Sequence, residues 1–456
     1  MNKSFKIFLA FLCLAFFILG CRKKDFADFY ERPEGLEPPI YQSLEKKGKF
    51  TNLLSLIDKA GYKQTLSTAG FWTMFAPTDS AFNVYFTQNN LSLSGIDSVK
   101  AQEIVKYLLV YNAFDKEKID DYQSTLLGWV PDIAFKRRTT YYNGFFSNTA
   151  KDSMFVNANR NGSYTSADNN NKHIPYFTDV FLTNKGLTAA DYNFFYPNST
   201  FNGFNVADAK VVEKDFSTEN GMIHVIDKVV TPLLSIDEYL EGKPQYSEFR
   251  NLLKKYIVSY ALNADASQRY KLLTGNNKDV YVKLYNGIGY SLNNENFTKL
   301  QDNDAQQDGW TIFVPTNEAL STYVNNVVLE YYKSFDNAPR QLVIDFINSH
   351  LFRNTVWPSK FLSSSNILSE PARFTPQTDI IDRKILSNGF FYGTNKVQES
   401  NIFSTVYSRA YLDPKFSYTT RLINTDGTLK FSLLDPGTKY TVFMMPDAVI
   451  TAAGYT

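Results

Sequence analysis

The chain has few of the residues on which thiol and metal chemistry depend. Its 456 residues include two cysteines, Cys13 and Cys21, and three histidines. A zinc site needs three or four converging ligands, usually at short spacings, and the sequence contains neither a C-x-x-C pair nor an H-x-x-x-H pattern. We therefore expect no bound metal and no cofactor. We also expect no internal disulfide, since Cys13 lies in a segment that is removed and Cys21 carries lipid.

Strong charge of either sign is also lacking, because the net charge is +1 and charged residues make up 20% of the chain. Nucleic acid is therefore not an expected partner. Patterns typical of phosphate-binding loops and serine nucleophiles, such as G-x-x-x-x-G-K and G-x-S-x-G, do not occur. The 46 acidic residues leave open a carboxylate pair of a glycan hydrolase, but the leading expectation is a protein that is not an enzyme.

The only long apolar run lies at the N-terminus and is too short to span a bilayer. Two lysines precede this run of residues 7–19, and Gly20-Cys21 follows it. A basic start, a short apolar run and a small residue before a cysteine predict a bacterial lipoprotein signal over residues 1–20. The acylated thiol of Cys21 would then hold the protein at a lipid bilayer. The proline-rich polar stretch 21–45 is expected to form a tether.

Aromatic residues are abundant, at 16% of the chain, and such residues favour strands. Apolar residues also recur at helical spacing in several segments. In the first half we expect helices over 50–60, 79–85 and 99–111, strands over 71–75, 138–142, 154–156, 206–212 and 223–230, and a loop insertion around 160–205. Together these elements predict a mixed α/β fold (α+β).

The order of elements recurs along the chain. A helix over 249–260, a strand and turn at 311–317 and a helix over 342–351 repeat the first half, and a looser third copy passes through 441–447. Internal repetition of this kind indicates tandem domains. We place them at residues 46–233, 234–400 and 401–456, the last being a partial repeat.

Two motifs mark the first repeat, and one of them returns clearly in the second. The first reads Thr73-Met74-Phe75-Ala76-Pro77-Thr78-Asp79-Ser80-Ala81-Phe82, and the second reads Asn220-Gly221-Met222-Ile223-His224-Val225-Ile226-Asp227. The second repeat carries Thr311-Ile312-Phe313-Val314-Pro315-Thr316-Asn317, followed by a degraded second motif at 388–397. This pair of motifs resembles the signatures of the fasciclin-like domain family.

The resemblance implies tandem domains, each with a small twisted β core and a helical layer. It also implies an extracellular adhesion and interaction module that is mostly non-catalytic, and similarity to fasciclin-domain lipoproteins of Bacteroidetes-type bacteria. Some family members carry a Tyr-His pair between the motifs that is implicated in adhesion. This chain has Tyr111-Asn112 and Ser349-His350 there, so integrin-type adhesion is not carried over.

Four aromatic residues are candidates for stacking on a sugar ring: Trp129, Tyr141, Tyr142 and Trp357. The alternative is that these side chains fill the β cores. His224 lies within an apolar strand, and we expect its ring nitrogens to be buried and bonded to the backbone or to Asp227.

The leading functional hypothesis is a membrane-anchored binding or adhesion lipoprotein on the outer membrane, facing the cell surface. The resemblance suggests an accessory subunit of an outer-membrane nutrient-uptake (Sus-type) complex that recognises a protein partner or a glycan. The expected partners are the bilayer, through acylated Cys21, and an outer-membrane transporter or lipoprotein that covers an open edge of the third repeat. The alternatives are a glycan hydrolase and a cell or matrix adhesin that is independent of transport.

Overall fold

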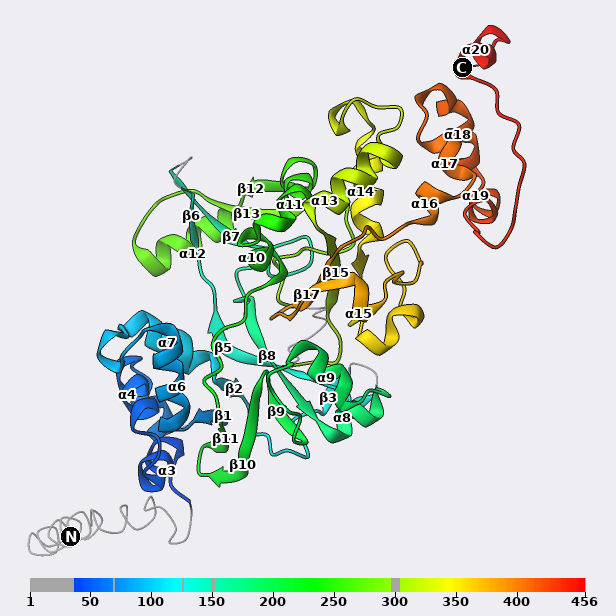
Figure 1. Ribbon diagram of the computed structural model, residues 1–456. Helices are drawn as coiled ribbons and strands as arrows, with labels where there is room; N and C mark the ends of the chain where they lie inside the picture. Colours follow the sequence, from blue (N-terminus) through cyan, green and yellow to red (C-terminus); the bar gives the residue numbers. More distant parts are fainter. Residues whose placement is uncertain (1–36, 69, 125–126, 149–151, 297–303, 456) are drawn as a thin grey trace, which may run out of the picture.

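The computed structural model describes residues 37–68, 70–124, 127–148, 152–296 and 304–455. The predicted lipoprotein signal, Cys21 and most of the predicted tether lie outside these residues. Each helix in the described part of the chain is too short or too polar to pass through a bilayer. Figure 1 shows the chain passing from the helices of the first repeat (blue), through regions rich in strands, to a helical end (red).

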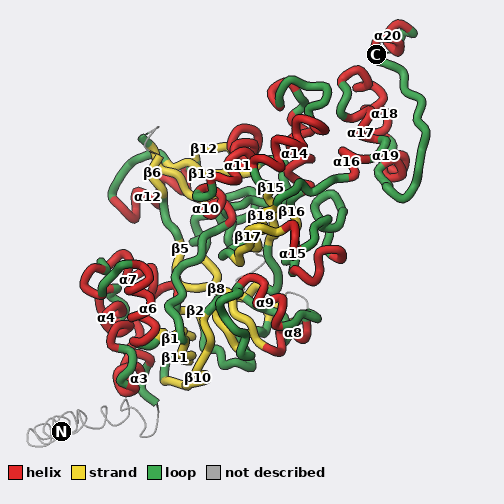
Figure 2. Tube along the Cα trace, viewed as in Figure 1, coloured by secondary structure: helices red, strands yellow, loops and turns green. Residues whose placement is uncertain are grey.

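The first domain is built on a sheet that closes on itself. Its strands follow the order β5-β2-β1-β11-β10-β9-β8, and β5 also pairs with β8. These strands are β1 (Trp72–Pro77), β2 (Leu109–Tyr111), β5 (Lys136–Tyr142), β8 (Asn171–Thr178), β9 (Phe204–Val206), β10 (Ala209–Thr218) and β11 (Gly221–Ile226). The helices beside β1 and β2 (Figure 2) are α3 (Ile40–Lys47), α4 (Thr51–Lys59), α5 (Lys63–Ser67), α6 (Asp79–Asn89) and α7 (Ser98–Tyr107). Smaller elements are the hairpin β3 (Tyr122–Ser124) and β4 (Gly128–Val130), and the helices α8 (Asp179–Asn184) and α9 (Ala189–Phe195).

The two sequence motifs of the first domain form neighbouring parallel strands. Strand β1 carries the first motif and pairs with β11, which carries the second, so that Trp72 lies opposite Gly221. Only glycine fits at this position, because an added Cβ would lie 2.0 Å from the carbonyl oxygen of Trp72. Both motifs therefore build the centre of the sheet.

The second domain repeats this central arrangement. The sheet β16-β15-β18-β17 matches β2-β1-β11-β10, and β15 pairs in parallel with β18, with Trp310 opposite Gly389. The degraded motif at 388–397 thus forms the same strand as the intact one. The elements are α10 (Ile236–Glu241), α11 (Ser247–Leu252), β15 (Trp310–Pro315), α13 (Asn317–Tyr323), α14 (Arg340–Ser349), β16 (Leu351–Phe352), α15 (Pro376–Asp379), β17 (Ile380–Ile385) and β18 (Gly389–Thr394).

A capping contact recurs in all three repeats. Asp79 accepts hydrogen bonds from two N–H groups at the start of α4, Asn317 accepts one at the start of α11, and Asp447 accepts two at the start of α18. The C-terminal helices are α16 (Asn401–Ser404), α17 (Tyr407–Tyr411), α18 (Ser417–Thr425), α19 (Gly427–Leu433) and α20 (Asp447–Ala452). The third repeat lacks the strand that precedes Asp79 and Asn317 in the other two, since residues 441–446 pair with no strand in the described chain.

Three other expectations are corrected by the structure. The predicted helix over 99–111 ends at Tyr107, because residues 109–111 join the sheet as β2 against β1. Residues 40–45, assigned to the tether, lie in α3, where the buried side chains of Ile40 and Leu44 pack into the first core. The region 160–205, expected as loops, contains β8, α8 and α9.

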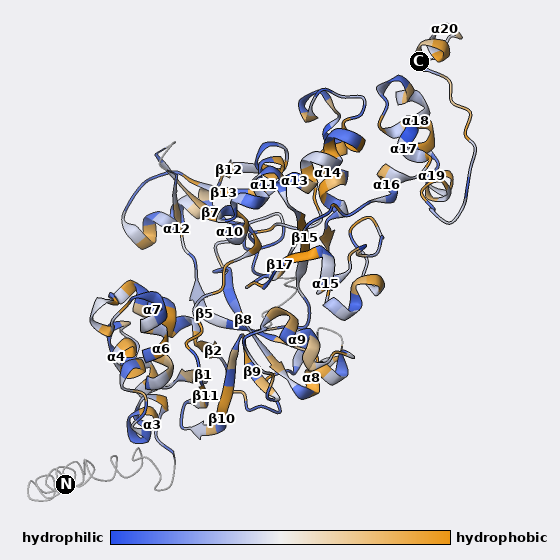
Figure 3. Ribbon diagram, viewed as in Figure 1, coloured by the Kyte–Doolittle hydropathy of each residue, from blue (hydrophilic) through white to orange (hydrophobic). Residues whose placement is uncertain are grey.

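The two domains share one aromatic core. Phe135, Phe177, Phe181, Tyr192 and Phe195 of the first domain pack with Phe313, Phe352, Trp357, Phe361, Phe390 and Tyr392 of the second. In Figure 3 the apolar colouring is strong in the strands around β15 and β17, next to this core. Burial of so many rings across the boundary fixes the two domains against each other.

Candidate binding pocket between the two domains

A small sheet joins insertions from both domains. Strands β6 (Phe146–Asn148) and β7 (Ser153–Asn157) come from the first domain, and β12 (Val258–Leu262) and β13 (Val280–Tyr285) come from the second. The strand order is β12-β13-β7-β6, and β13 pairs in parallel with β7 from Val280 opposite Met154 to Lys283 opposite Asn157. Helix α12 (Ala264–Thr274) lies beside this sheet and contacts β13 (Figure 1). The four-stranded sheet therefore forms only when the inserted segment of the first domain (β6 and β7) meets that of the second domain (β12 and β13).

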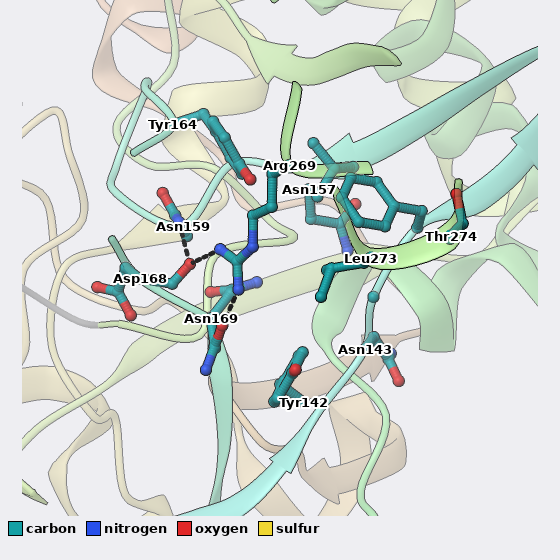
Figure 4. A pocket seen from close by; sticks show the side chains of 14 residues that line it. Tyr142, Asn143, Asn157, Asn159, Tyr164, Asp168, Asn169, Arg269, Leu273 and Thr274 are labelled. Atoms are coloured by element: carbon teal, nitrogen blue, oxygen red, sulfur yellow. Dashed lines mark hydrogen bonds between the residues drawn. The ribbon is translucent and has the colours of Figure 1, made fainter. Parts of the chain in front are cut away.

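A pocket with a volume of about 230 Å³ opens beside this sheet. It is lined by Tyr142, Asn143, Gly144, Phe145, Val156, Asn157, Asn159, Tyr164, Asp168, Asn169, Asn170, Arg269, Leu273 and Thr274. Figure 4 shows the guanidinium of Arg269 next to Asp168 and Asn169, between Tyr164 on one side and Tyr142 on the other. Aromatic faces and amide groups thus surround a space that suits one small ring-shaped ligand.

Hydrogen bonds hold one wall of the pocket in place. The guanidinium of Arg269 donates to the backbone oxygen of Asp168 at 2.9 Å and also to the side-chain oxygen of Asn169. Asn159 donates to the same Asp168 oxygen at 2.8 Å and to the backbone oxygen of Thr165 at 2.6 Å. The loop that supplies the amides is therefore preorganised before any ligand binds.

A second, shallower groove of about 450 Å³ lies at the other face of the same sheet. Its aromatic residues include Phe146 and Phe155, whose rings stack with centroids 5.0 Å apart. The acidic residues around it are neutralised by lysines: Lys283 lies 2.5 Å from Asp237, Lys254 lies 2.7 Å from Glu241, and Lys172 lies 2.7 Å from Glu238. The groove is therefore aromatic with little free charge.

The structure brings one of the four candidate aromatics to the pocket. Tyr142 lines it, whereas Tyr141 packs against the core of the first domain and donates a hydrogen bond from its hydroxyl to Asn143 at 2.8 Å. Burial raises the pKa of Tyr141 to about 12. Trp129 is 58% exposed on β4, in the β3–β4 hairpin. Trp357 is only 5% exposed within the shared aromatic core, so the suggestion that it stacks on a ligand is corrected.

The motif residues prove to be structural. The hydroxyl of Thr73 donates to the backbone oxygen of Asn112 and accepts from the N–H of Phe114, both at 2.8 Å, and Thr311 makes the equivalent pair of bonds. Thr78 and Thr316 cap α6 and α13. Phe75 and Phe313 are fully buried, and Pro77 and Pro315 end their strands.

His224 is fully buried and both of its ring nitrogens bond the backbone, as expected. Its Nε2 lies 2.9 Å from the backbone oxygen of Phe114, and its Nδ1 accepts from the N–H of Asp215 at 3.3 Å. Burial lowers the pKa of His224. Asp227 instead accepts a hydrogen bond from the N–H of Lys210 at 2.7 Å, because it follows the end of β11 on the side of β10.

The two pairs considered at the family's Tyr-His position, Tyr111-Asn112 and Ser349-His350, are not equivalent in the structure, because Leu108 holds the place of His350 in the first domain. His350 is fully buried, and its Nδ1 lies 2.8 Å from the backbone oxygen of Phe346. Asn112 is exposed and donates to the carboxylate of Asp304 at 2.7 Å. The side chains therefore serve packing and domain contact.

Several pocket residues carry no local signal in the sequence. Arg269 lies on a helix whose neighbours are mostly exposed, and Asn159 and Tyr164 lie in a polar stretch typical of a surface loop. Their convergence depends on the pairing of β7 with β13, which joins segments distant in sequence.

Comparisons with known proteins agree with the motifs. The model of the Fasciclin domain family matches residues 48–174 and 161–232. Human periostin is 24% identical over 229 residues, which cover 50% of this chain and 20% of periostin, so the match spans about a fifth of that relative's length. A solved FAS1 domain pair from the insect cell adhesion molecule fasciclin I is 13% identical, covers 78% of this chain and 98% of its own, and has a TM-score of 0.27.

Proposed function

Because this chain belongs to the fasciclin domain family, we propose that it is a non-catalytic binding and adhesion protein that recognises a sugar in the pocket between its insertions. Domains of this family are linked to adhesion and protein interaction, and they are typically non-enzymatic. The observation that carries the proposal is the lining of the pocket, where tyrosine rings and asparagine amides face one small space.

The chemistry of the lining favours a neutral sugar. Aromatic faces such as those of Tyr142 and Tyr164 bury the C–H groups of a pyranose ring, and amides such as Asn157 bond its hydroxyls. Among the described residues that line the pocket, Asp168 is the one carboxylate, and Arg160 lies 3.4 Å from it. A glycan hydrolase uses two carboxylates across the scissile bond, so recognition fits this lining better than cleavage.

The proposed cellular setting comes from the N-terminal sequence. We place the protein at the outer membrane, anchored through acylated Cys21, facing the cell surface and acting beside a transporter or lipoprotein of a nutrient-uptake complex. Adhesion to cells or matrix without a transporter is the second candidate, and the family's link to adhesion favours it. Fatty-acid labelling of the wild type but not of Cys21→Ser supports the anchor, whereas equal labelling of both contradicts it.

The pocket is tested by glycan binding of the full mature chain. We expect binding to at least one sugar on an array of mono- and oligosaccharides, and a loss of about fivefold or more in affinity in Tyr164→Ala, since one stacked ring contributes about 1 kcal/mol or more. Tyr331→Ala removes an exposed tyrosine that does not line the pocket and serves as the control. No binding to any sugar, or equal losses in both variants, would exclude the pocket as a sugar site.

A further inference from the structure

Three carboxylates meet at the base of the β3–β4 hairpin in the first domain. Asp120, Asp121 and Asp132 each place one oxygen so that the three oxygens lie within 4.8 Å of one another. The hairpin register, with Tyr122 opposite Val130, places Asp120 and Asp121 on one leg and Asp132 on the other. Oxygens that share a cation at 2.3–2.6 Å are at most about 5 Å apart, so these three have the spacing of ligands.

One carboxylate oxygen of these three residues has no hydrogen-bond partner in the part of the chain that the structure describes. Asp121 is only 8% exposed, and its Oδ1 is buried without a hydrogen-bond donor. A buried carboxylate oxygen that receives no hydrogen bond is costly. A cation bound among the three side chains removes that cost, because it supplies the missing contact.

The neighbouring carboxylate of Asp120 is also buried, and no positive charge neutralises it among the contacts that the structure describes. Asp120 is almost fully buried, and its Oδ2 accepts a hydrogen bond from the hydroxyl of Thr178 at 2.5 Å. Thr178 fixes the orientation of the side chain without neutralising it.

The cations near the cluster are occupied or loosely placed. The guanidinium of Arg137 donates to the backbone oxygens of Ile119 and Asp121 at 2.7 and 2.5 Å, so it braces the backbone rather than the carboxylates. The amine of Lys118 lies 3.7 Å from Asp121, and that lysine side chain is 65% exposed, so it can swing into solvent. The cluster therefore keeps an excess of negative charge.

We propose that Asp120, Asp121 and Asp132 form a calcium site that clamps the two legs of the β3–β4 hairpin. Three carboxylates supply only hard oxygen ligands, which suit calcium, and water completes its coordination. Two large apolar side chains of this hairpin, Leu127 and Trp129, are exposed. Calcium at the base therefore fixes the orientation of a projecting tryptophan that is separate from the sugar pocket.

Metal binding to the full mature chain tests this site directly. We expect saturable 1:1 binding of Ca²⁺ by calorimetry, with a dissociation constant in the range of about 10⁻⁵ to 10⁻³ M. We also expect sensitised luminescence from bound Tb³⁺, because Trp129 and Tyr122 lie in the same hairpin. Calcium should raise the melting temperature by mass action.

Two variants and one control separate the site from general acidity. Asp132→Asn, on the less buried leg, should weaken Ca²⁺ binding at least tenfold while the metal-free protein keeps its circular dichroism spectrum. Asp121→Asn should do the same. Asp208→Asn removes a surface carboxylate of the same domain that is paired with Lys228, and it should leave binding unchanged. Absence of saturable binding up to 10 mM Ca²⁺ (roughly tenfold above the weakest extracellular sites), or equal binding by Asp132→Asn and Asp208→Asn, overturns the proposal.

Discussion

Equivalent residues in the two domains show which contacts the fold requires. The ring of His224 bonds the backbone oxygen of Phe114, and at the matching position of β18 the hydroxyl of Tyr392 bonds the backbone oxygen of Val356 at 2.6 Å. Both domains therefore keep a hydrogen bond from the strand to the loop that follows β2 or β16, although the side chain changes from the imidazole of His224 to the phenol of Tyr392. Replacement of a histidine by another buried donor explains why the second motif looks degraded while its strand is intact.

His350 makes stability depend on pH. Burial lowers its pKa to about 4, compared with about 6.5 in an unfolded chain. The contribution of the neutral His350 ring to the free energy of unfolding is complete above pH 6.5. It is lost as the pH falls toward 4, because between these pH values the imidazole binds a proton in the unfolded state but not in the folded state. The loss is about 3 kcal/mol in total.

The variant His350→Leu tests this dependence. Leu108 holds the matching position in the first domain, since its backbone oxygen accepts from Phe75 as that of His350 accepts from Phe313. Urea unfolding at pH 7.5 and pH 4.5 should show a smaller loss of stability in the variant than in the wild type. The other titrating groups are common to both proteins, so parallel losses would refute the assignment to His350.

At the scale of elements, the close approach of two parallel strands depends on one glycine in each domain. A Cβ at Gly221 would lie 2.0 Å from the Trp72 carbonyl oxygen, and one at Gly389 would lie 2.3 Å from that of Trp310. These oxygens belong to the neighbouring strand, so they cannot move aside without breaking the sheet. A short glycine-led motif therefore specifies which strands lie side by side.

Gly221→Ala should lower the free energy of unfolding by about 2 kcal/mol or more, because overpacking against backbone forces the strands apart. Gly242→Ala is the matched control: it ends α10, and its nearest contact would be 3.8 Å away. Thermal unfolding of both variants measures the difference. Similar melting temperatures for the two would show that β1 and β11 tolerate the added methyl group.

Local sequence patterns predicted the elements that depend on neighbouring residues. The motif strands, the helices that follow them and the repetition of the sheet order were found because their signals lie within a few residues, as in Thr78 capping α6. Pairings between distant segments were not found. The sequence predicts a tether where α3 lies because prolines precede Ile40, and it predicts a loop where β8 lies because the polar neighbours of β8 resemble a linker.

The pocket was only partly predictable for the same reason. Tyr142 follows from its aromatic character, but Arg269 and Asn159 meet it only because β7 pairs with β13. The acidic cluster at the hairpin base was also missed, since Asp132 lies apart from Asp120 in sequence and no metal-binding spacing connects them. A binding site whose residues come from strands distant in sequence cannot be predicted from the sequence of any one of those segments.

At the scale of the whole molecule, buried charge as well as aromatic packing ties the domains together. The amine of Lys172 on β8 lies 2.7 Å from Glu238 and 3.0 Å from Glu295, both in the second domain. Burial opposes the charge on Lys172, but the two carboxylates outweigh it, so the pKa of this lysine is raised. The contact stabilises the interface only while all three partners are present.

Lys172→Met should therefore destabilise the protein by about 3 kcal/mol, because it leaves buried carboxylates without a counter-ion. Lys254→Met breaks the exposed pair with Glu241 and should cost less than about 1 kcal/mol. Calorimetry should show both domains melting in a single transition in the wild type. Two separate transitions, or equal effects of the two variants, would mean that the domains are energetically independent.

The parallel pairing of β7 with β13 also constrains how this protein comes to be folded. During synthesis β7 leaves the ribosome long before β13 exists, since the rest of the first domain and the start of the second are translated between them. The nascent first domain therefore presents an open backbone edge on β7 throughout that interval, and such edges invite mispairing with other chains. A prematurely terminated product that lacks β13 keeps this edge unpaired, so it is expected to aggregate rather than to accumulate as a folded first domain.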